Sequence, residues 1–200
     1  MLSPNLILAS ASPRRRMLLA QVGVDCDVHP VDIDESALPG EMPATYVERL
    51  ALAKARACRD LAGTPDDALF LGADTAVVVD GEILGKPRDR EHAFAMLRRL
   101  SGREHQVLTA VALVRGEREA VRTSTSVVGF ADISAAAIAA YWETGEPADK
   151  AGAYGIQGHA AAFIHHVSGS YSGVVGLPLF ETVAMLAEFG VDVWQARGKR

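Results

Sequence analysis

The chain has 200 residues, of which 49% are hydrophobic and 22% charged, so it can bury one sizeable core or two small lobes that share a sheet. Its formal net charge of -5 argues against a general nucleic-acid-binding protein, whose surface would be basic. We therefore expect one globular unit in which any phosphate site is a local cluster of basic residues.

The two cysteines, Cys26 and Cys58, lie among apolar neighbours and have neither metal-ligand nor disulfide-framework spacing. We expect buried thiols in a reducing compartment. The first ten residues lack the basic region of a secretory signal, and no apolar run has the length of a membrane span. These features predict a cytoplasmic protein with no membrane partner.

A short buried strand is predicted over residues 6–9, and a helix begins directly after it. Ser12 is a suitable N-cap, and Pro13 suits the first helical position, where a missing N–H costs nothing. Backbone N–H groups, the Ser10 hydroxyl and the three arginines 14–16 meet at this turn, as an anion site requires. The alternative is an ordinary charged helix face.

Residues 24–33 alternate apolar and polar side chains until Pro30 interrupts them, which is typical of an edge strand. Three carboxylates follow within residues 32–35, ending at Glu35. Such an acidic loop is either a solvated turn or a source of oxygen ligands for a hard cation such as Mg²⁺.

A helix is predicted over residues 43–61, because apolar residues recur there at a spacing of 3.6. At 100° per residue, Lys54 falls in the middle of the apolar stripe. A lysine in that position must either extend its amine to solvent or meet an anion.

Residues 69–87 are the most informative stretch. Two apolar runs, 69–71 and 76–79, predict a buried strand with Asp74 between them. A buried charge is costly without a partner, so Asp74 is either a structural residue at a bend or is paired with a base, a metal ion or a ligand. Asp80 and Gly81 predict a tight hairpin turn that returns Lys86 towards the level of Asp74.

The rest of the chain predicts a helix ending at Ser101, a hairpin of residues 106–114 and 120–130, and a helix that Ser134 caps. A strand over 160–167 and a last helix from Leu179 follow, and residues 191–200 carry little signal. Residues 146–158 are Gly-rich without a consistent period, which favours a functional loop. The Gln157 amide both donates and accepts hydrogen bonds, which suits the imide edge of uracil or thymine.

Taken together, residues 5–190 resemble the Maf family of nucleotide pyrophosphatases, also described as septum formation inhibitors. Seven motifs in the family's order carry the resemblance, and together they are far more specific than any one alone. They are Leu-Ala-Ser-Ala-Ser-Pro-Arg-Arg at 8–15, Asp-Glu-Ser at 34–36, Ala-Leu-Ala-Lys-Ala at 51–55, Gly-Ala-Asp-Thr at 72–75, Gly-Lys-Pro at 85–87, Asp-Lys-Ala-Gly-Ala-Tyr-Gly-Ile-Gln-Gly at 149–158 and Val-Val-Gly-Leu-Pro at 174–178.

The resemblance implies an α/β fold with a long, bent mixed sheet flanked by helices, similar to inosine triphosphate pyrophosphatases, with a cleft between two lobes. It also implies hydrolysis of a nucleoside triphosphate to the monophosphate and pyrophosphate with a divalent cation, Mg²⁺ or Mn²⁺. By resemblance, Asp74 is the proton acceptor. Ser10, Arg14, Glu35, Lys54 and Lys86 handle phosphate and metal, while Arg14, Thr75 and Gln157 bear on substrate choice.

The segment ending Tyr-Gly-Ile-Gln-Gly resembles the branch that acts on dTTP and UTP. Two alternatives stay open: a preference for 7-methyl-GTP or modified pyrimidine triphosphates, and a nucleotide-sensing regulator of cell division. The sequence does not decide between a monomer and a homodimer.

Overall fold

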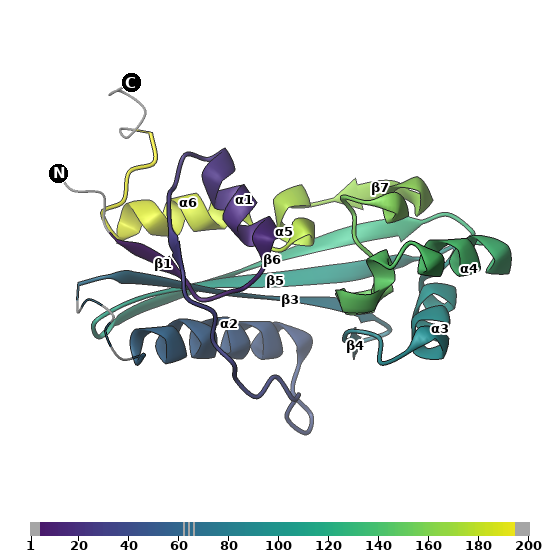
Figure 1. Ribbon diagram of the computed structural model, residues 1–200, viewed down its shortest axis with the longest axis horizontal. Coiled ribbons are helices and arrows are strands. Elements are labelled where there is room, and N and C mark those ends of the chain that lie inside the picture. Colours follow the sequence, from purple (N-terminus) through teal and green to yellow (C-terminus); the bar gives the residue numbers. More distant parts are fainter. Residues whose placement is uncertain (1–4, 62, 64, 66, 195–200) are drawn as a thin grey trace.

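A mixed sheet of seven strands runs through the molecule (Figure 1). The computed structural model describes residues 5–61, 63, 65 and 67–194. The strands are β1 (Leu6–Leu8), β2 (Asp27–Val28), β3 (Leu69–Val79), β4 (Glu82–Leu84), β5 (Glu104–Arg115), β6 (Arg118–Phe130) and β7 (Ile164–Ser168). Their order is β2-β1-β3-β5-β6-β7, and β4 also pairs with β3. Pairs β1/β2 and β1/β3 are parallel and the others antiparallel, which confirms the mixed α/β fold.

Helices cover both faces of this sheet and one of its ends (Figure 1). They are α1 (Pro13–Gln21), α2 (Pro43–Arg59), α3 (Arg90–Leu100), α4 (Ala135–Glu143), α5 (Tyr171–Val175) and α6 (Leu179–Glu188). In the view of Figure 1, α2 lies below the long strands and α1, α5 and α6 lie above them. Helices α3 and α4 lie at the right-hand end of the sheet. Because β3 is covered on both faces, it reads as a nearly continuous apolar run.

The apolar side chains form separate clusters that define two lobes. In the first lobe, one cluster packs between the sheet and α1 and α6, and another between the sheet and α2. The second lobe is built around α3, α4 and the outer ends of β3, β5 and β6. The long strands β3 and β5 contribute to both lobes and connect them.

The edge of β3 is left open between these lobes. On this side of β3, β1 pairs with residues 69–71 and β4 pairs with residues 77–79. No described strand pairs there with residues 72–76, which include Asp74 and Thr75. The chain leaves β1 at Ala9 and β4 at Gly85, so the segments that carry Ser10 and Lys86 enter this gap from its two ends.

Most predicted elements are confirmed, including the hairpin of β5 and β6, the Ser134 cap of α4 and the turn at Asp80 and Gly81, both with positive φ. The edge strand expected over 24–33 is confirmed in place but reduced to β2, because Pro30 cannot donate to a ladder. The prediction of a strand over 160–167 is wrong in its first part, because residues 159–163 form a 3₁₀ helix.

Three smaller differences concern α5, α2 and the cysteines. The short helix α5 was not predicted, and α2 ends at Arg59 rather than at residue 61. Cys58 is buried as expected, whereas Cys26 is only partly buried, so the expectation for Cys26 was wrong. Within the described part of the predicted tail, Val193 packs in the core, and residues 195–200 lie outside the described residues.

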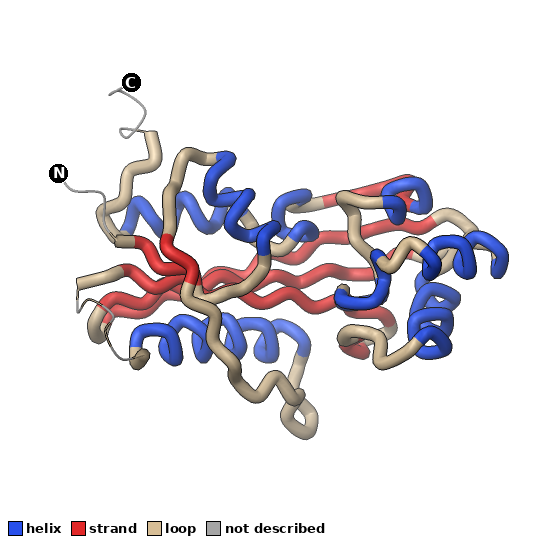
Figure 2. Tube along the Cα trace, viewed as in Figure 1, coloured by secondary structure: helices blue, strands red, loops and turns tan. Residues whose placement is uncertain are grey.

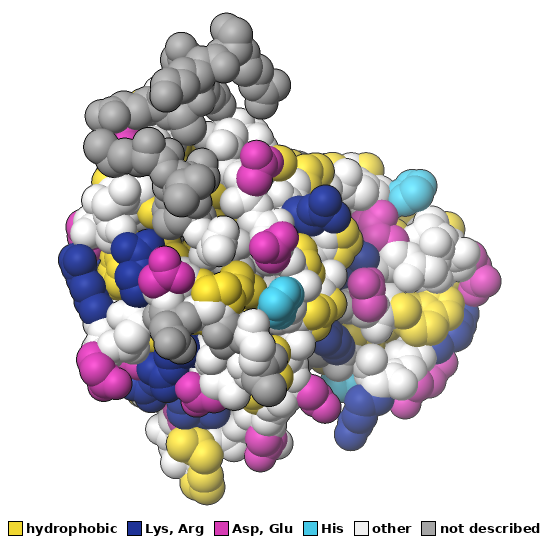
Figure 3. Space-filling model, turned by 60° about the vertical axis from the view of Figure 1, so that its left-hand side comes forward, with side chains coloured by type: hydrophobic (Ala, Val, Ile, Leu, Met, Phe, Trp, Pro, Cys, Tyr) yellow, Lys and Arg dark blue, Asp and Glu magenta, His cyan; other side chains and the backbone are white. Residues whose placement is uncertain are grey.

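The surface is mixed in charge on the face that Figure 3 presents, where acidic and basic side chains alternate without one continuous basic area. Within the described residues, no helix is both long and apolar enough to cross a membrane.

Candidate active site

A cleft of about 920 Å³ occupies the gap along β3 and is lined by both lobes. The first lobe contributes the turn after β1, the start of α1, and α2. The second lobe contributes the end of β4 and the segment 146–158. Among the described residues that line the cleft, five are basic and four acidic, although the protein carries a net charge of -5. The expected local basic cluster is therefore present: Arg14, Arg15, Lys54, Lys86 and Lys150.

Lys54, Asp74 and Glu35 meet at the centre of the cleft. Lys54 on α2 is only 8% exposed and Asp74 on β3 only 7%. The Lys54 Nζ lies 2.7 Å from Asp74 Oδ1 and 2.5 Å from Glu35 Oε1. The lysine on the apolar stripe therefore meets an anion rather than solvent, and the carboxylate in the apolar strand has a base as its partner.

Gly72 allows this contact by letting α2 approach β3 closely. Side chains alternate along a strand, so Gly72 and Asp74 share the face that α2 covers. A Cβ at Gly72 would lie 2.1 Å from the backbone oxygen of Ala51, one turn before Lys54 on α2. A larger residue at 72 would push the helix away and lengthen the contact between Lys54 and Asp74.

Burial and charge act in opposite directions on the two carboxylates. Desolvation raises the pKa of Asp74 above its ordinary value, although the Lys54 charge and hydrogen bond oppose that shift. Burial also opposes ionisation of Glu35, but it is half-exposed, and the hydrogen bond and charge of Lys54 lower its pKa overall. Asp74 is therefore the better proton acceptor of the pair, because a raised pKa makes a carboxylate more basic.

The loop that carries Glu35 runs between β2 and the start of α2 and is drawn in tan in Figure 2, and side chains of α2 hold it by hydrogen bonds. The Tyr46 hydroxyl donates to the Glu35 backbone oxygen at 3.0 Å. Arg49 donates to the Ser36 backbone oxygen at 3.1 Å and to both carboxylate oxygens of Glu41 at 2.6 and 2.7 Å. These contacts place an exposed acidic loop against a buried lysine. The sequence analysis did not identify Tyr46 or Arg49 as residues that hold this loop.

Ser10 and Arg15 form the wall at the start of α1. Arg15 Nη1 donates to Ser10 Oγ at 3.0 Å, and its Nε donates to the backbone oxygen of Gly176 at 2.9 Å. Its Nη2 lies 3.5 Å from the hydroxyl of Thr75, which in turn lies 3.0 Å from that of Thr109. Burial lowers the pKa of Arg15, an effect that the nearby Asp74 charge opposes.

Arg15 was therefore missed by the sequence analysis, which chose Arg14 from the same run. A signal for it was available, because Arg15 lies three and four residues before the buried Leu18 and Leu19 and so shares their face of the helix. Arg14 lines the cleft and makes none of the three Arg15 contacts.

Lys86 and Gln157 line the same cleft and come from the segment after β4 and from the segment 146–158. Both are exposed, and the positive charge of Lys86 contributes to the lowered pKa of Glu35. The structure thus brings every sequence-predicted site residue to one cleft: Ser10, Arg14, Glu35, Lys54, Asp74, Thr75, Lys86 and Gln157.

Residues 5–189 match the family described as Maf-like protein. The chain belongs to this family. A dTTP/UTP pyrophosphatase of Hahella chejuensis is 56% identical over 189 residues, which cover 94% of each chain. A dTTP/UTP pyrophosphatase of Symbiobacterium thermophilum is 58% identical over 189 residues, covering 94% of this chain and 96% of the relative. Among solved structures, the Staphylococcus aureus Ham1 protein is similar at 17% identity with a TM-score of 0.46, over 64% of this chain and 72% of that chain.

Glu35 and Asp74 are the kind of residues that could hold a divalent cation in this Maf-like cleft. Each directs one carboxylate oxygen at the Lys54 amine, which occupies the point between them. Mg²⁺ in proteins commonly takes one or two carboxylates and completes its shell with water and substrate phosphates. Within residues 5–61, 63, 65 and 67–194, no group of three or more His, Cys, Asp and Glu side chains is arranged for a metal ion.

Proposed function

We propose that this protein hydrolyses dTTP and UTP to the monophosphate and pyrophosphate. The contact of Lys54 with both Asp74 and Glu35 is the observation that carries the proposal. It places a carboxylate of raised pKa, Asp74, beside the ammonium group of Lys54 in the cleft. The names of the Hahella and Symbiobacterium relatives support the same reaction and the same two substrates.

In this reaction Asp74 accepts the proton of the attacking water. The water oxygen bonds to the α-phosphorus, and the bond from that phosphorus to the oxygen bridging the β-phosphate breaks, which releases pyrophosphate. Lys54, Lys86 and Arg14 offset the negative charge of the triphosphate and of the departing pyrophosphate. A divalent cation held by Glu35 and Asp74 would act as a Lewis acid on the phosphate oxygens.

The nucleobase lies towards Gln157 in this proposal. Uracil and thymine present an N–H donor between two carbonyl acceptors, and the Gln157 amide offers the complementary acceptor and donor. Gln157 comes from the segment 146–158, whereas Ser10 and Arg15 come from the turn after β1 and the start of α1, so one ligand in this cleft can place its phosphates against one segment and its base against the other. Thr75 and Arg14 contact the part of the ligand between them.

The test is product analysis with purified protein, Mg²⁺ or Mn²⁺, and a panel of triphosphates that includes dTTP, UTP, 7-methyl-GTP, ATP and modified pyrimidines. We expect equal amounts of monophosphate and pyrophosphate, with the largest kcat/KM for dTTP and UTP and no turnover when the cation is chelated. Release of orthophosphate would contradict the proposed bond cleavage. Preferred turnover of 7-methyl-GTP would contradict the substrate choice, and binding without turnover would favour a nucleotide-sensing regulator.

A further inference from the structure

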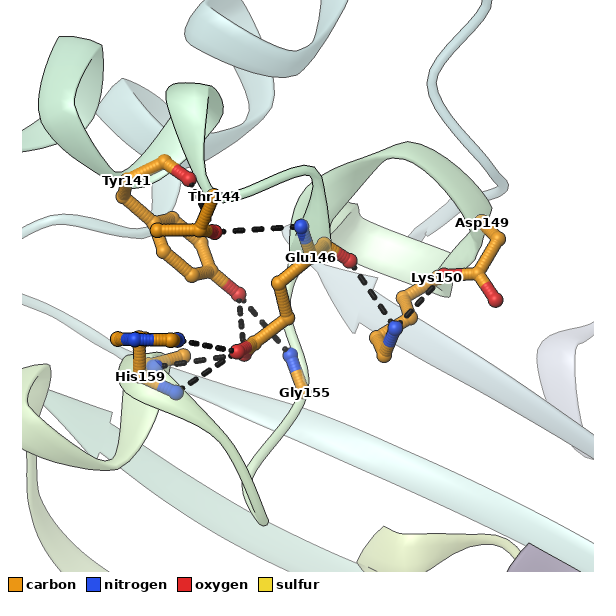
Figure 4. A network of polar contacts seen from close by, with 8 residues as sticks. Tyr141, Thr144, Glu146, Asp149, Lys150, Gly155 and His159 are labelled. Atoms are coloured by element: carbon orange, nitrogen blue, oxygen red, sulfur yellow. Dashed lines mark hydrogen bonds and ion pairs between the residues drawn. The ribbon is translucent and has the colours of Figure 1, made fainter. Parts of the chain in front are cut away.

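The wall of the cleft that carries Gln157 is an irregular segment organised around one carboxylate. It contains two short 3₁₀ turns, η1 (Glu146–Asp149) and η2 (Ala151–Ala153), and its remaining residues form no helix or strand up to residue 158. Glu146 lies at its start, and the side chain is only 13% exposed. Figure 4 shows its carboxylate between Tyr141 of α4 and His159.

The Glu146 carboxylate is linked to the backbone on both sides of Gln157, through the Tyr141 hydroxyl before it and directly after it. The Tyr141 hydroxyl donates to Oε1 at 2.8 Å, and the same hydroxyl accepts from the backbone N–H of Gly155 at 3.3 Å. The backbone N–H of His159 donates to Oε2 at 2.7 Å, and His159 Nδ1 lies 3.1 Å from the same oxygen. The backbone N–H two residues after Gln157 thus donates directly to Glu146, whereas the one two residues before it donates to the Tyr141 hydroxyl, which in turn donates to Glu146 (Figure 4).

Gly158 permits this arrangement by its lack of a side chain. A Cβ at this position would lie 2.0 Å from Glu146 Oε2 and 2.4 Å from the Cδ atom, so the carboxylate could not remain where it is. The φ of Gly158 is -110°, which other residues adopt, so close approach rather than left-handed backbone is what this glycine provides.

The charge of Glu146 is stabilised where it lies. Burial alone would raise its pKa, but the hydrogen bonds from the His159 backbone, Tyr141 and the His159 side chain lower it overall. An ionised carboxylate accepts hydrogen bonds at both oxygens, whereas an amide of the same shape accepts at only one. The arrangement therefore requires a carboxylate rather than only a polar side chain of that size.

We propose that Glu146 is a positioning residue that holds residues 155–159 so that Gln157 faces the nucleobase. This inference rests on the proposed function and adds the element that fixes substrate choice. Glu146 acts through the backbone and through Tyr141, and its oxygens are engaged by the loop. It is a determinant of base recognition rather than of phosphate chemistry.

The test is a double-mutant cycle of Glu146→Ala and Gly158→Ala with KM for dTTP as the readout. Alone, each substitution should raise KM by up to about tenfold, the change expected for losing one hydrogen bond between Gln157 and the base. In the Glu146→Ala background, Gly158→Ala should add less than about twofold, because its collision partner is gone. Equal factors for Gly158→Ala in both backgrounds would overturn the proposal.

A second readout separates base recognition from general damage. Inorganic tripolyphosphate has no base, so its inhibition constant should stay within about twofold in every variant. A parallel loss of tripolyphosphate affinity would mean a structural role only and would overturn the proposal. Hydrogen exchange should speed up at the amides of residues 155–159 in Glu146→Ala. Glu143→Ala, at the exposed end of α4, is the matched control and should change neither the KM for dTTP nor the exchange rates.

A milder variant covers the case in which Glu146→Ala does not fold. Tyr141→Phe removes only the hydroxyl that joins Gly155 to the carboxylate, so it should raise KM for dTTP in the same direction by a smaller factor. An unchanged KM in a folded Tyr141→Phe would contradict the inference. If the wild-type protein turns over no triphosphate, the proposed function itself fails, whereas an active wild type with additive variants refutes only the role of Glu146.

Discussion

The two ends of the cleft are built in different ways. At the phosphate end, Lys54 and Asp74 come from a long helix and a central strand, and an ion pair between buried charges holds them. At the base end, Gln157 is an exposed residue of an irregular segment. Backbone N–H groups of that segment donate hydrogen bonds to Tyr141 and Glu146, which hold it in place. In the proposed function, the chemistry that needs a fixed carboxylate therefore belongs to regular elements, and substrate choice belongs to an irregular segment.

The largest effect should follow from Asp74→Asn. Asn cannot accept the proton of water, so we expect kcat to fall by about 10²- to 10⁴-fold at saturating metal. The stability should change little, because Lys54 keeps Glu35 as a partner and burial already disfavours the ionised Asp74. Steady-state kinetics and urea unfolding check the two expectations, with Asp80→Asn, at the exposed end of the same hairpin, as the matched control.

The pH dependence sharpens the same prediction. Activity requires ionised Asp74 and burial raises its pKa, so the acid limb of kcat/KM against pH should lie above the ordinary aspartate value of 3.8. Asp74→Asn should lose this limb, since no proton acceptor remains at that position. Near-full turnover by the variant, or an unchanged acid limb in its residual activity, would contradict the assignment of Asp74.

The next effect compares Arg15 with Arg14, which are adjacent but differ in their contacts. Arg15→Lys loses the guanidinium group that donates to both Ser10 and the Gly176 oxygen, so the free energy of unfolding should fall by about 1.5 to 3 kcal/mol. We also expect kcat/KM to fall about tenfold or more, because the wall of the phosphate end shifts. Arg14→Lys should change stability by less than about 0.5 kcal/mol and raise KM alone. Urea unfolding separates the two, and equal losses of stability would remove the distinction.

The phosphate end could be predicted from the sequence because each of its features breaks a local pattern. Lys54 interrupts an apolar helical stripe, and Asp74 interrupts an apolar strand. Such interruptions need a partner, and only a few partners of opposite charge were available. The long helices and strands followed from their regular spacing, which periodicity detects, whereas the bent mixed sheet and the cleft between two lobes were implied by the family resemblance.

The base end could not be predicted in this way. Neither Glu146 nor Tyr141 breaks a pattern, because a glutamate after a helix is ordinary and an aromatic residue on α4 suits the core. Their roles depend on the contact between residues 141, 146, 155 and 159, which irregular backbone brings together. Arg15 was missed for a related reason, since the run of three arginines was not placed against the buried residues of its own helix, although Arg14 itself lines the cleft.

The smallest effect, and the one that defines the base end, should come from Gln157→Glu. The carboxylate keeps the length of the side chain but loses the N–H donor, so kcat/KM for dTTP and UTP should fall about tenfold. Because Gln157 is exposed, the free energy of unfolding should change by less than about 0.5 kcal/mol. Gln106→Glu, at an exposed position of β5 outside the cleft, supplies the same charge change as a control.

Inhibition by tripolyphosphate distinguishes the two ends of the cleft. Its inhibition constant should stay nearly constant in Gln157→Glu, as in the Glu146 variants, but should rise in Arg14→Lys. If Gln157→Glu left the ranking of triphosphates unchanged, the base would have to be recognised elsewhere, and the division of the cleft into a phosphate end and a base end would fail with it.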